Sequence, residues 1–309
     1  MAYLLFLGGL IALVVGGDLL VRGAVGVARR LSVPPLVIGL TLVGFGTSAP
    51  ELATSVQAAL GGAPGVAVGN VVGSNVANIL LILGLAVLLR PIALDGAAFR
   101  RDGAALVLAT ALGMGLMLTG RLAGWHGALL LAGLAVFLLV TFRQPGPVAP
   151  DDLPPPAAVM HAPLWRTGAM ALAGLALLVG GAEALVTGAI EIAGAFGVSE
   201  AVIGLTIVAV GTSLPELVTS VIAARKGESA VAFGNVLGSN IFNLLGILGV
   251  TAIVVPVEVP ERIAAFDLWV MAGATLLLVA MAVSGWRLSR REGAVLLLLY
   301  GAYVVTALA

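Results

Sequence analysis

The sequence predicts an all-α polytopic membrane protein, with ten transmembrane helices arranged as two inverted five-helix repeats. Of its 309 residues, 61% are hydrophobic and only 10% are charged, which leaves too little polar surface for a water-soluble protein of this size. Apolar runs of about twenty residues recur along the chain, and each is long enough to cross a hydrocarbon core of roughly 30 Å. One stretch of 49 residues also occurs in two related copies.

The apolar pattern has one long break, which divides the chain. We expect a first five-helix repeat over 1–142, a cytoplasmic linker over 143–163 and a second, inverted five-helix repeat over 164–309. The linker is rich in proline and lacks apolar periodicity. The N-terminal apolar run has no basic segment before it, so we interpret it as a span rather than a signal peptide. The ten expected spans lie near 3–22, 35–60, 65–89, 103–119, 122–142, 164–187, 200–224, 229–255, 265–283 and 292–308.

The basic residues give the chain an orientation. Thirteen of the fifteen lie in or beside loops that follow odd-numbered spans, and only Arg121 and Arg262 follow even-numbered ones. By the positive-inside rule, the odd-numbered loops are cytoplasmic and both termini lie outside. We therefore expect a multi-pass protein of the cell membrane (plasma or inner). Asp18 could pair with Arg22 one helical turn later, which favours a structural role for this acid.

The composition excludes several classes of function. The chain has no cysteine and a formal net charge of 0, so disulfides, thiol chemistry and cysteine-ligated metals are excluded, and no basic tract suggests nucleic acid binding. No histidine lies near the repeated motifs described below, so we expect no catalytic residue, no cofactor and no enzymatic activity. No feature indicates an obligate protein partner, and the expected partners are the lipid bilayer and transported ions.

The internal repeat is the strongest signal in the sequence. A shift of 165 residues aligns 36–84 with 201–249 without a gap, and 31 of the 49 aligned positions are identical. Because each half has five spans, an odd number, the second half should lie upside down relative to the first. Inverted repeats with a binding site at their interface are a common architecture of secondary transporters.

The first repeated motif places a proline and a glutamate inside an apolar span, as GTSAPELATS at 46–55 and GTSLPELVTS at 211–220. Pro50 has no N–H to offer the carbonyl of Gly46, so the helix should open there and free backbone oxygens. Inside a bilayer such oxygens need partners from protein, water or ions. Glu51 adds a formal charge beside them. The neighbouring hydroxyl residues are Thr47, Ser48 and Ser55, and the second copy repeats the cluster with Thr212, Ser213, Pro215, Glu216 and Ser220.

The second repeated motif is GNVVGSNVAN at 69–78 and GNVLGSNIFN at 234–243. In each copy an asparagine, a serine and an asparagine fall at i, i+4 and i+8, which forms one polar stripe on an apolar helix. These residues are Asn70, Ser74 and Asn78 in the first copy and Asn235, Ser239 and Asn243 in the second.

Together the motifs supply carboxylates, freed carbonyls, hydroxyls and amides, which are all oxygen donors. Such a set suits a hard cation such as Na⁺ or Ca²⁺. Two facing carboxylates carry a charge of about −2, which one Ca²⁺ or two Na⁺ would neutralise. Because the empty pair is costly in a low-dielectric site, translocation should be easier when the site is loaded, and this coupling is the physical basis of an obligate exchanger.

The motifs closely resemble the two α-repeats of the cation/calcium antiporter superfamily, which includes the Na⁺/Ca²⁺ exchangers and their prokaryotic relatives. The resemblance covers nearly the whole chain. It implies secondary active antiport of Na⁺ for Ca²⁺ by alternating access, with the first and sixth helices sliding across the core. It also implies that Glu51 and Glu216 are central ligands of both ions. The other implied ligands are backbone oxygens of Thr47 and Thr212, carbonyls of Gly44 and Ala209, hydroxyls of Ser48, Ser213, Ser74 and Ser239 at flanking Na⁺ sites, and the side chains of Asn78 and Asn243.

Two other functions fit the same residues. In an H⁺-coupled exchanger of Ca²⁺ or another divalent cation, the glutamates would carry protons, although the hydroxyl-rich flanks favour Na⁺. A passive cation channel fits less well, because a site between inverted repeats suits alternating access better than a continuous pore. Some members of the superfamily have Asp where this chain has Asn78 or Asn243, so ion stoichiometry and K⁺ co-transport stay open.

Overall fold

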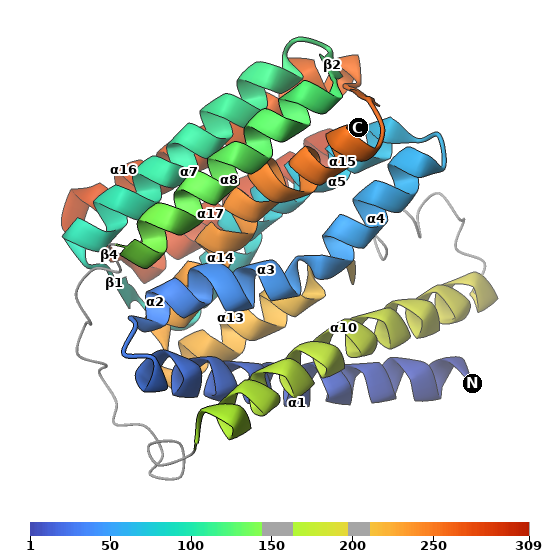
Figure 1. Cartoon of the computed structure of the whole chain (residues 1–309). Coiled ribbons are helices and arrows are strands. Elements are labelled where there is room, and N and C mark those ends of the chain that lie inside the picture. Colours follow the sequence, from blue (N-terminus) through green and yellow to red (C-terminus); the bar gives the residue numbers. More distant parts are fainter. Residues whose placement is uncertain (144–162, 197–210, 309) are drawn as a thin grey trace.

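The structure, a computed structural model, describes residues 1–143, 163–196 and 211–308, and these residues are almost entirely helical (Figure 1). Most of the expected linker over 143–163, and the part of the expected span 200–224 that precedes Gly211, lie outside the described residues. The first half contains α1 (Ala2–Arg30), α2 (Pro35–Ile38), the π-helical turn η1 (Gly39–Val43), α3 (Gly44–Thr47), α4 (Ala49–Leu60), α5 (Pro64–Ala77), η2 (Asn78–Leu83), α6 (Gly84–Leu89), β1 (Ile92–Ala93), α7 (Gly96–Met117), β2 (Arg121–Leu122) and α8 (Gly124–Arg143). The second half contains α10 (Leu164–Ala195), α13 (Leu214–Lys226), α14 (Ser229–Phe242), η4 (Asn243–Ile247), α15 (Leu248–Val254), β3 (Val257–Glu258), η5 (Ile263–Asp267), α16 (Leu268–Gly285), β4 (Arg287–Leu288) and α17 (Arg290–Leu308).

Within the described residues, six helices are long and apolar enough to cross a membrane: Ala2–Arg30, Pro64–Leu89, Gly124–Arg143, Leu164–Ala195, Ser229–Val254 and Ile263–Gly285. A seventh is added if Pro35–Thr47 and Ala49–Leu60, which are bent by 42° at Ser48, count as one broken span. The helices α7 and α17 occupy the positions of the fourth and tenth expected spans without meeting this criterion. The protein is therefore a mostly helical multi-pass membrane protein, and the count of ten spans stays a prediction.

The first helix is longer than the sequence indicated. The expected span ended near residue 22, whereas α1 continues to Arg30. Several of the small apolar residues that follow Arg22, including Ala24 and Ala28, are completely buried, so packing carries the helix past the arginines. The expected contact between Asp18 and Arg22 is confirmed at 2.8 Å, and Lys226 at the end of α13 contacts the same carboxylate.

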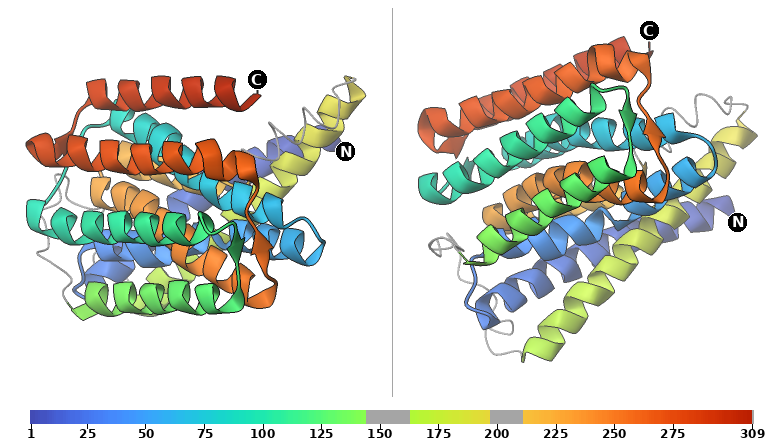
Figure 2. Two further views of the ribbon diagram at one scale, coloured as in Figure 1. Left: turned by 90° about the horizontal axis from the view of Figure 1, so that it is seen from above. Right: turned by 45° about the horizontal axis from the view of Figure 1, so that its top comes forward.

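The helices α1 and α10 form a tightly packed antiparallel pair along one edge of the molecule, and the other helices lie on one side of them (Figures 1 and 2). Glycines make this approach possible. A Cβ added at Gly16 would lie 2.8 Å from the carbonyl oxygen of Gly174, and one at Gly174 would lie 2.4 Å from the backbone nitrogen of Leu20. Backbone therefore meets backbone along this pair, as small residues permit in membrane helices.

Two short antiparallel ladders join the halves at their loops. β1 pairs with β4, with Ile92 opposite Leu288, and β2 pairs with β3, with Arg121 opposite Glu258. Thr110 and Thr275, which are equivalent under the 165-residue shift, also place their hydroxyl oxygens 3.4 Å apart. Contacts between equivalent residues occur where a twofold axis relates two halves. These contacts agree with the inverted arrangement that the sequence predicts.

Candidate ion-binding site

The first repeated motif breaks its helix as the proline predicted. α3 ends at Thr47, Ser48 leaves the helical conformation, and α4 begins at Ala49 with Pro50 in its first turn. Glu51 therefore lies in the first turn of α4, where unpaired N–H groups and the helix dipole favour a negative charge. Glu216 occupies the same place in the first turn of α13. Both helix starts thus hold a carboxylate in the interior of the protein.

The two carboxylates are buried, and each accepts a hydrogen bond from the opposite half. Glu51 and Glu216 are both 1% exposed. The Ser48 hydroxyl donates to Glu216 Oε1 at 2.9 Å, and the Ser213 hydroxyl donates to Glu51 Oε1 at 3.3 Å. These reciprocal bonds bring the four residues into one site at the interface of the halves.

A pair of asparagines, for which the sequence suggested no ligand role, holds the glutamate helices in place. Asn70 Nδ2 donates to the backbone carbonyl of Glu51 at 3.2 Å and to the Ser55 hydroxyl at 3.0 Å. In the other half, Asn235 donates to the carbonyl of Glu216 at 3.2 Å and to Ser220 at 2.9 Å. Ser55 and Ser220 therefore support the site rather than face an ion. Their presence in both motif copies was the signal that could have revealed this role.

Four buried carboxylate and amide oxygens at the site have no hydrogen-bond donor among the described residues. They are the second carboxylate oxygens of Glu51 and Glu216 and the amide oxygens of Asn78 and Asn243. All four residues are 1% exposed. Because a buried acceptor without a partner is costly, a matched set of such oxygens is suited to a cation.

Both asparagines begin a π-helical turn. η2 starts at Asn78 and η4 starts at Asn243, so the backbone hydrogen-bond ladder changes at the same point of each repeat. Such turns occur frequently at functional sites because they redirect side chains and backbone groups. No feature of the sequence indicated these turns.

The remaining expected ligands fall into three groups. The hydroxyl of Ser239 donates to the Gly44 carbonyl at 3.1 Å, so this oxygen already accepts a hydrogen bond. Ser74 Oγ lies 3.5 Å from Ser213 Oγ, next to the Glu51 carboxylate. Ala209 lies outside the described residues, and its role stays a prediction.

The threonines differ between the two copies of the first motif. The hydroxyl of Thr47 lies within hydrogen-bond distance of the Val43 carbonyl (3.0 Å) and of Asn235 Oδ1 (3.2 Å). The hydroxyl of Thr212 is buried without a partner among the described residues. These hydroxyl contacts do not test whether the backbone oxygens of Thr47 and Thr212 bind ions.

All the donor atoms at the site are oxygens. Only two of its members are acids, and among the described residues no group of three or more His, Cys, Asp or Glu could hold a metal ion. The rest are neutral amide, hydroxyl and carbonyl oxygens. Hard cations with flexible coordination accept such a mixture, whereas zinc and copper prefer nitrogen and sulfur.

Comparisons with known proteins agree with this geometry. The family model of the sodium/calcium exchanger protein matches residues 1–143 and 167–309. CaxA of Alkalimonas amylolytica is 41% identical over 314 residues, which cover 98% of this chain and 97% of CaxA. The sodium/calcium exchanger MaX1 of Methanosarcina acetivorans is 34% identical over 348 residues, which cover 98% of this chain and 97% of MaX1.

The fold is also similar to that of a solved exchanger. A structure of the sodium-calcium exchanger NCX_Mj, soaked with 2.5 mM Na⁺ and 0.1 mM Ca²⁺, matches with a TM-score of 0.87 and 31% sequence identity. The match covers 98% of this chain and 97% of the other. The family match spans nearly all of the sequence, including both copies of each motif. The chain therefore belongs to the sodium/calcium exchanger family of membrane transporters.

Proposed function

We propose that this protein is a secondary active antiporter that exchanges Na⁺ for Ca²⁺ across the membrane by alternating access. The observation that carries the proposal is the set of four buried oxygens without donors, two from each half. Two of them belong to carboxylates, so a divalent cation is favoured at the centre. The similarity to MaX1 and NCX_Mj, which are both named sodium/calcium exchangers, supports the choice of ions.

In this proposal, Glu51 and Glu216 bind Ca²⁺ and Na⁺ in turn. Asn78 and Asn243 contribute their amide oxygens at the middle, and the motif serines line flanking Na⁺ positions. One Ca²⁺ or two Na⁺ would balance a charge of about −2 from the two carboxylates. The unloaded site would carry an uncompensated charge through a low-dielectric interior, which slows its movement and couples the two ion fluxes.

The moving part is inferred to be the pair of α1 and α10, acting as one body. Within the pair, backbone contacts backbone at positions such as Gly16. Toward the other helices the contacts are made by side-chain ends: a Cβ at Gly17 would meet the Ile222 Cδ1 atom at 2.6 Å, and one at Gly46 would meet the Leu175 methyls. Flexible methyl ends rearrange more easily than packed backbone, so the pair should slide over the rest of the protein without separating.

Proton coupling is the nearest alternative, because buried carboxylates can also carry protons. The hydroxyls of Ser48 and Ser213 at the carboxylates favour Na⁺, since a proton needs no additional oxygen ligands. A passive channel is less well supported, because both carboxylates are buried in this structure, each 1% exposed.

The test is transport by the purified protein in liposomes loaded with Na⁺ at clamped pH. Dilution into Na⁺-free buffer should drive uptake of radioactive Ca²⁺, and the Glu51→Gln variant should show none. Parallel vesicles with a pH gradient and no Na⁺ should remain inactive. Uptake driven only by the pH gradient would replace Na⁺ by H⁺ as the coupling ion. Uptake that follows the Ca²⁺ gradient alone would indicate a channel.

A further inference from the structure

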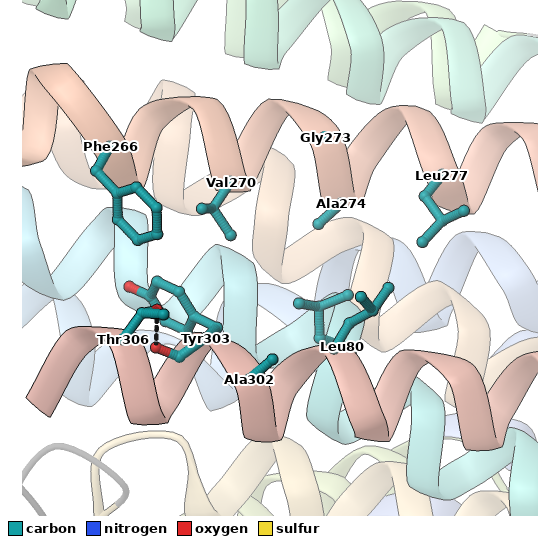
Figure 3. A pocket seen from close by; sticks show the side chains of 10 residues that line it. Leu80, Phe266, Val270, Gly273, Ala274, Leu277, Ala302, Tyr303 and Thr306 are labelled. Atoms are coloured by element: carbon teal, nitrogen blue, oxygen red, sulfur yellow. Dashed lines mark hydrogen bonds between the residues drawn. The ribbon is translucent and has the colours of Figure 1, made fainter. Parts of the chain in front are cut away.

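Two apolar grooves on the surface of the bundle are equivalent under the 165-residue shift. One, of about 620 Å³, lies between α7 and α8, and the other, of about 380 Å³, lies between α16 and α17 (Figure 3). Leu112 lines the first groove where Leu277 lines the second, and Leu245 corresponds in the same way to Leu80. Both grooves lie between helices that the sequence predicts to span the membrane. Because the repeat makes the two grooves equivalent, a difference between them indicates a property that belongs to one groove.

The grooves differ in charge at the end where α7 and α16 begin. Arg101 and Asp102 line that end of the α7–α8 groove and form an ion pair of 2.6 Å. The residue that corresponds to Arg101 in the α16–α17 groove is Phe266, and Asp267 there accepts a hydrogen bond from the Tyr303 hydroxyl at 3.0 Å. Only the α7–α8 groove therefore has a cationic side chain in its lining.

The grooves also differ at a pair of equivalent threonines, Thr141 and Thr306. In the α16–α17 groove, the Thr306 hydroxyl donates to the Tyr303 carbonyl at 2.8 Å, as Figure 3 shows. In the α7–α8 groove, Thr141 is 1% exposed, and its hydroxyl oxygen has no hydrogen-bond partner among the residues that the structure describes. A buried hydroxyl that lines a cavity and lacks a partner indicates a ligand with an acceptor oxygen at that point.

The length of the α7–α8 groove matches one leaflet. Along α7 it extends from Arg101 to Leu112, which is a rise of about 17 Å in an α-helix. A hydrocarbon core is roughly 30 Å thick, so the groove reaches about half way across it. A further arginine, the exposed Arg143 that ends α8, lies at the Thr141 end, which the distribution of basic residues assigns to the cytoplasmic side.

We propose that the α7–α8 groove binds one anionic phospholipid of the cytoplasmic leaflet. One acyl chain occupies the apolar groove, an ester or phosphate oxygen accepts a hydrogen bond from Thr141, and the negatively charged headgroup lies beside Arg143. Basic residues at the membrane surface attract anionic headgroups in this way. The α16–α17 groove lacks both the arginine and the unpaired hydroxyl, so it takes up bulk lipid without this preference.

The experiment measures lipid retained by the full-length protein, using native mass spectrometry after purification with dioleoylphosphatidylglycerol or dioleoylphosphatidylcholine. The wild type should retain one phosphatidylglycerol in preference to phosphatidylcholine. Arg143→Gln, which removes the positive charge, should reduce that preference, whereas Thr141→Val, which removes the hydroxyl at nearly constant volume, should reduce the retention of lipid about fivefold, the typical effect of one hydrogen bond. The matched variant Thr306→Val should leave it unchanged. Ala132→Phe, which fills the α7–α8 groove from its exposed side, should abolish it.

Melting temperatures of all variants would show whether each is folded, so that a loss of lipid is not confused with a loss of structure. Equal retention of both lipids by the wild type would overturn the proposal. An equal effect of Thr141→Val and Thr306→Val would also overturn it, because it would show unspecific lipid. A dimer that Ala132→Phe dissociates would show that a second copy of the chain covers the groove instead.

Discussion

The two halves of the ion site make the same hydrogen bonds, but they are buried to different extents. In α14 every residue from Val231 to Ile241 is buried. In α5 the corresponding stretch is open at several points: Val66 is 56% exposed, and Gly69, Asn70 and Gly73 are partly exposed. The halves therefore share one chemistry and differ in how far they are covered. The elements that pack on α14 include α2, η1 and α3, and most of the stretch that corresponds to them, 200–212, lies outside the described residues.

The largest effect should come from removing either carboxylate. Glu51→Gln and Glu216→Gln keep the size of the side chain but leave one uncompensated charge in a buried site, and a loss of this kind is worth about 3 kcal/mol or more. Na⁺-driven Ca²⁺ uptake should fall more than about 100-fold in both variants. Similar losses would show that both halves bind the same ion despite their different exposure.

The decisive control is binding, measured by calorimetry on the same two variants. A variant that retains wild-type Ca²⁺ affinity would show that its glutamate is a structural residue, and the shared site would then be wrong. Ser55→Ala offers a matched comparison within the motif, because its hydroxyl contacts Asn70 rather than a carboxylate. It should reduce uptake far less than either glutamine variant.

The sequence was sufficient for the glutamates but not for the contacts between them. A proline beside a charge in an apolar span, repeated at a fixed shift, predicts a broken helix and a buried carboxylate. The bonds from Ser48 to Glu216 and from Ser213 to Glu51 connect residues more than 160 positions apart, so they depend on how the halves face each other. Periodicity within one helix contains no information about that geometry.

The sequence did not predict the local backbone details for a different reason. The π-helical turns at Asn78 and Asn243 add one residue to a single turn, and within a run of leucine and isoleucine this leaves no visible change in pattern. The extension of α1 to Arg30 was obscured because arginines normally mark the end of a span. Ala24 and Ala28 are buried against neighbouring helices, and this packing, which only the fold reveals, extends α1 to Arg30.

The second-largest effect should be a loss of stability, and it tests the difference in packing between the halves. A Cβ at Gly238 would lie 2.1 Å from the Leu40 carbonyl oxygen, whereas one at the equivalent Gly73 would meet no atom of the described residues within 4 Å. Gly238→Ala should therefore destabilise the protein by about 1–3 kcal/mol, the usual cost of overpacking. Gly73→Ala should melt near the wild-type temperature. Thermal unfolding in detergent, followed by light scattering, compares the two.

The same pair of variants probes the transport cycle. If the halves exchange their surroundings during transport, Gly73 becomes the crowded position in the alternate state. Gly73→Ala should then fold normally and still slow Na⁺-driven Ca²⁺ uptake. Wild-type transport by Gly73→Ala would argue against an exchange of environments between the two halves.

A smaller effect should separate the two supporting asparagines. Asn235 is completely buried, so Asn235→Ala leaves the Glu216 carbonyl and the Ser220 hydroxyl without their donor. The expected loss is about 1–3 kcal/mol of stability. Asn70 makes the equivalent bonds but is partly exposed, so water can replace its amide, and Asn70→Ala should cost less. Unfolding midpoints that rank the variants in the opposite order would mean that the difference in exposure does not reflect access of water.

The smallest effect concerns a contact that exists on one side of the molecule alone. Asp18 connects α1 to Lys226 on α13, and the 165-residue shift maps this pair onto Glu183 and Gly61, so the equivalent ion pair cannot form. Lys226→Gln should therefore favour the alternate state by about 0.5–1 kcal/mol, the value of a partly exposed ion pair, which changes the ratio of states two- to fivefold. Glu183→Gln should leave that ratio unchanged.

The chain has no native cysteine, so single-molecule fluorescence between dyes on two introduced cysteines, one on α1 and one on α16, can measure this ratio. High salt should reduce the effect of Lys226→Gln, because exposed ion pairs are screened. A salt-independent change, or an equal change in Glu183→Gln, would locate the asymmetry in packing rather than in this ion pair. The ion pair of Asp18 with Lys226 would then be a by-product of the two unequal faces, and the contacts of Gly238 with Leu40 would be the better explanation of why one state predominates.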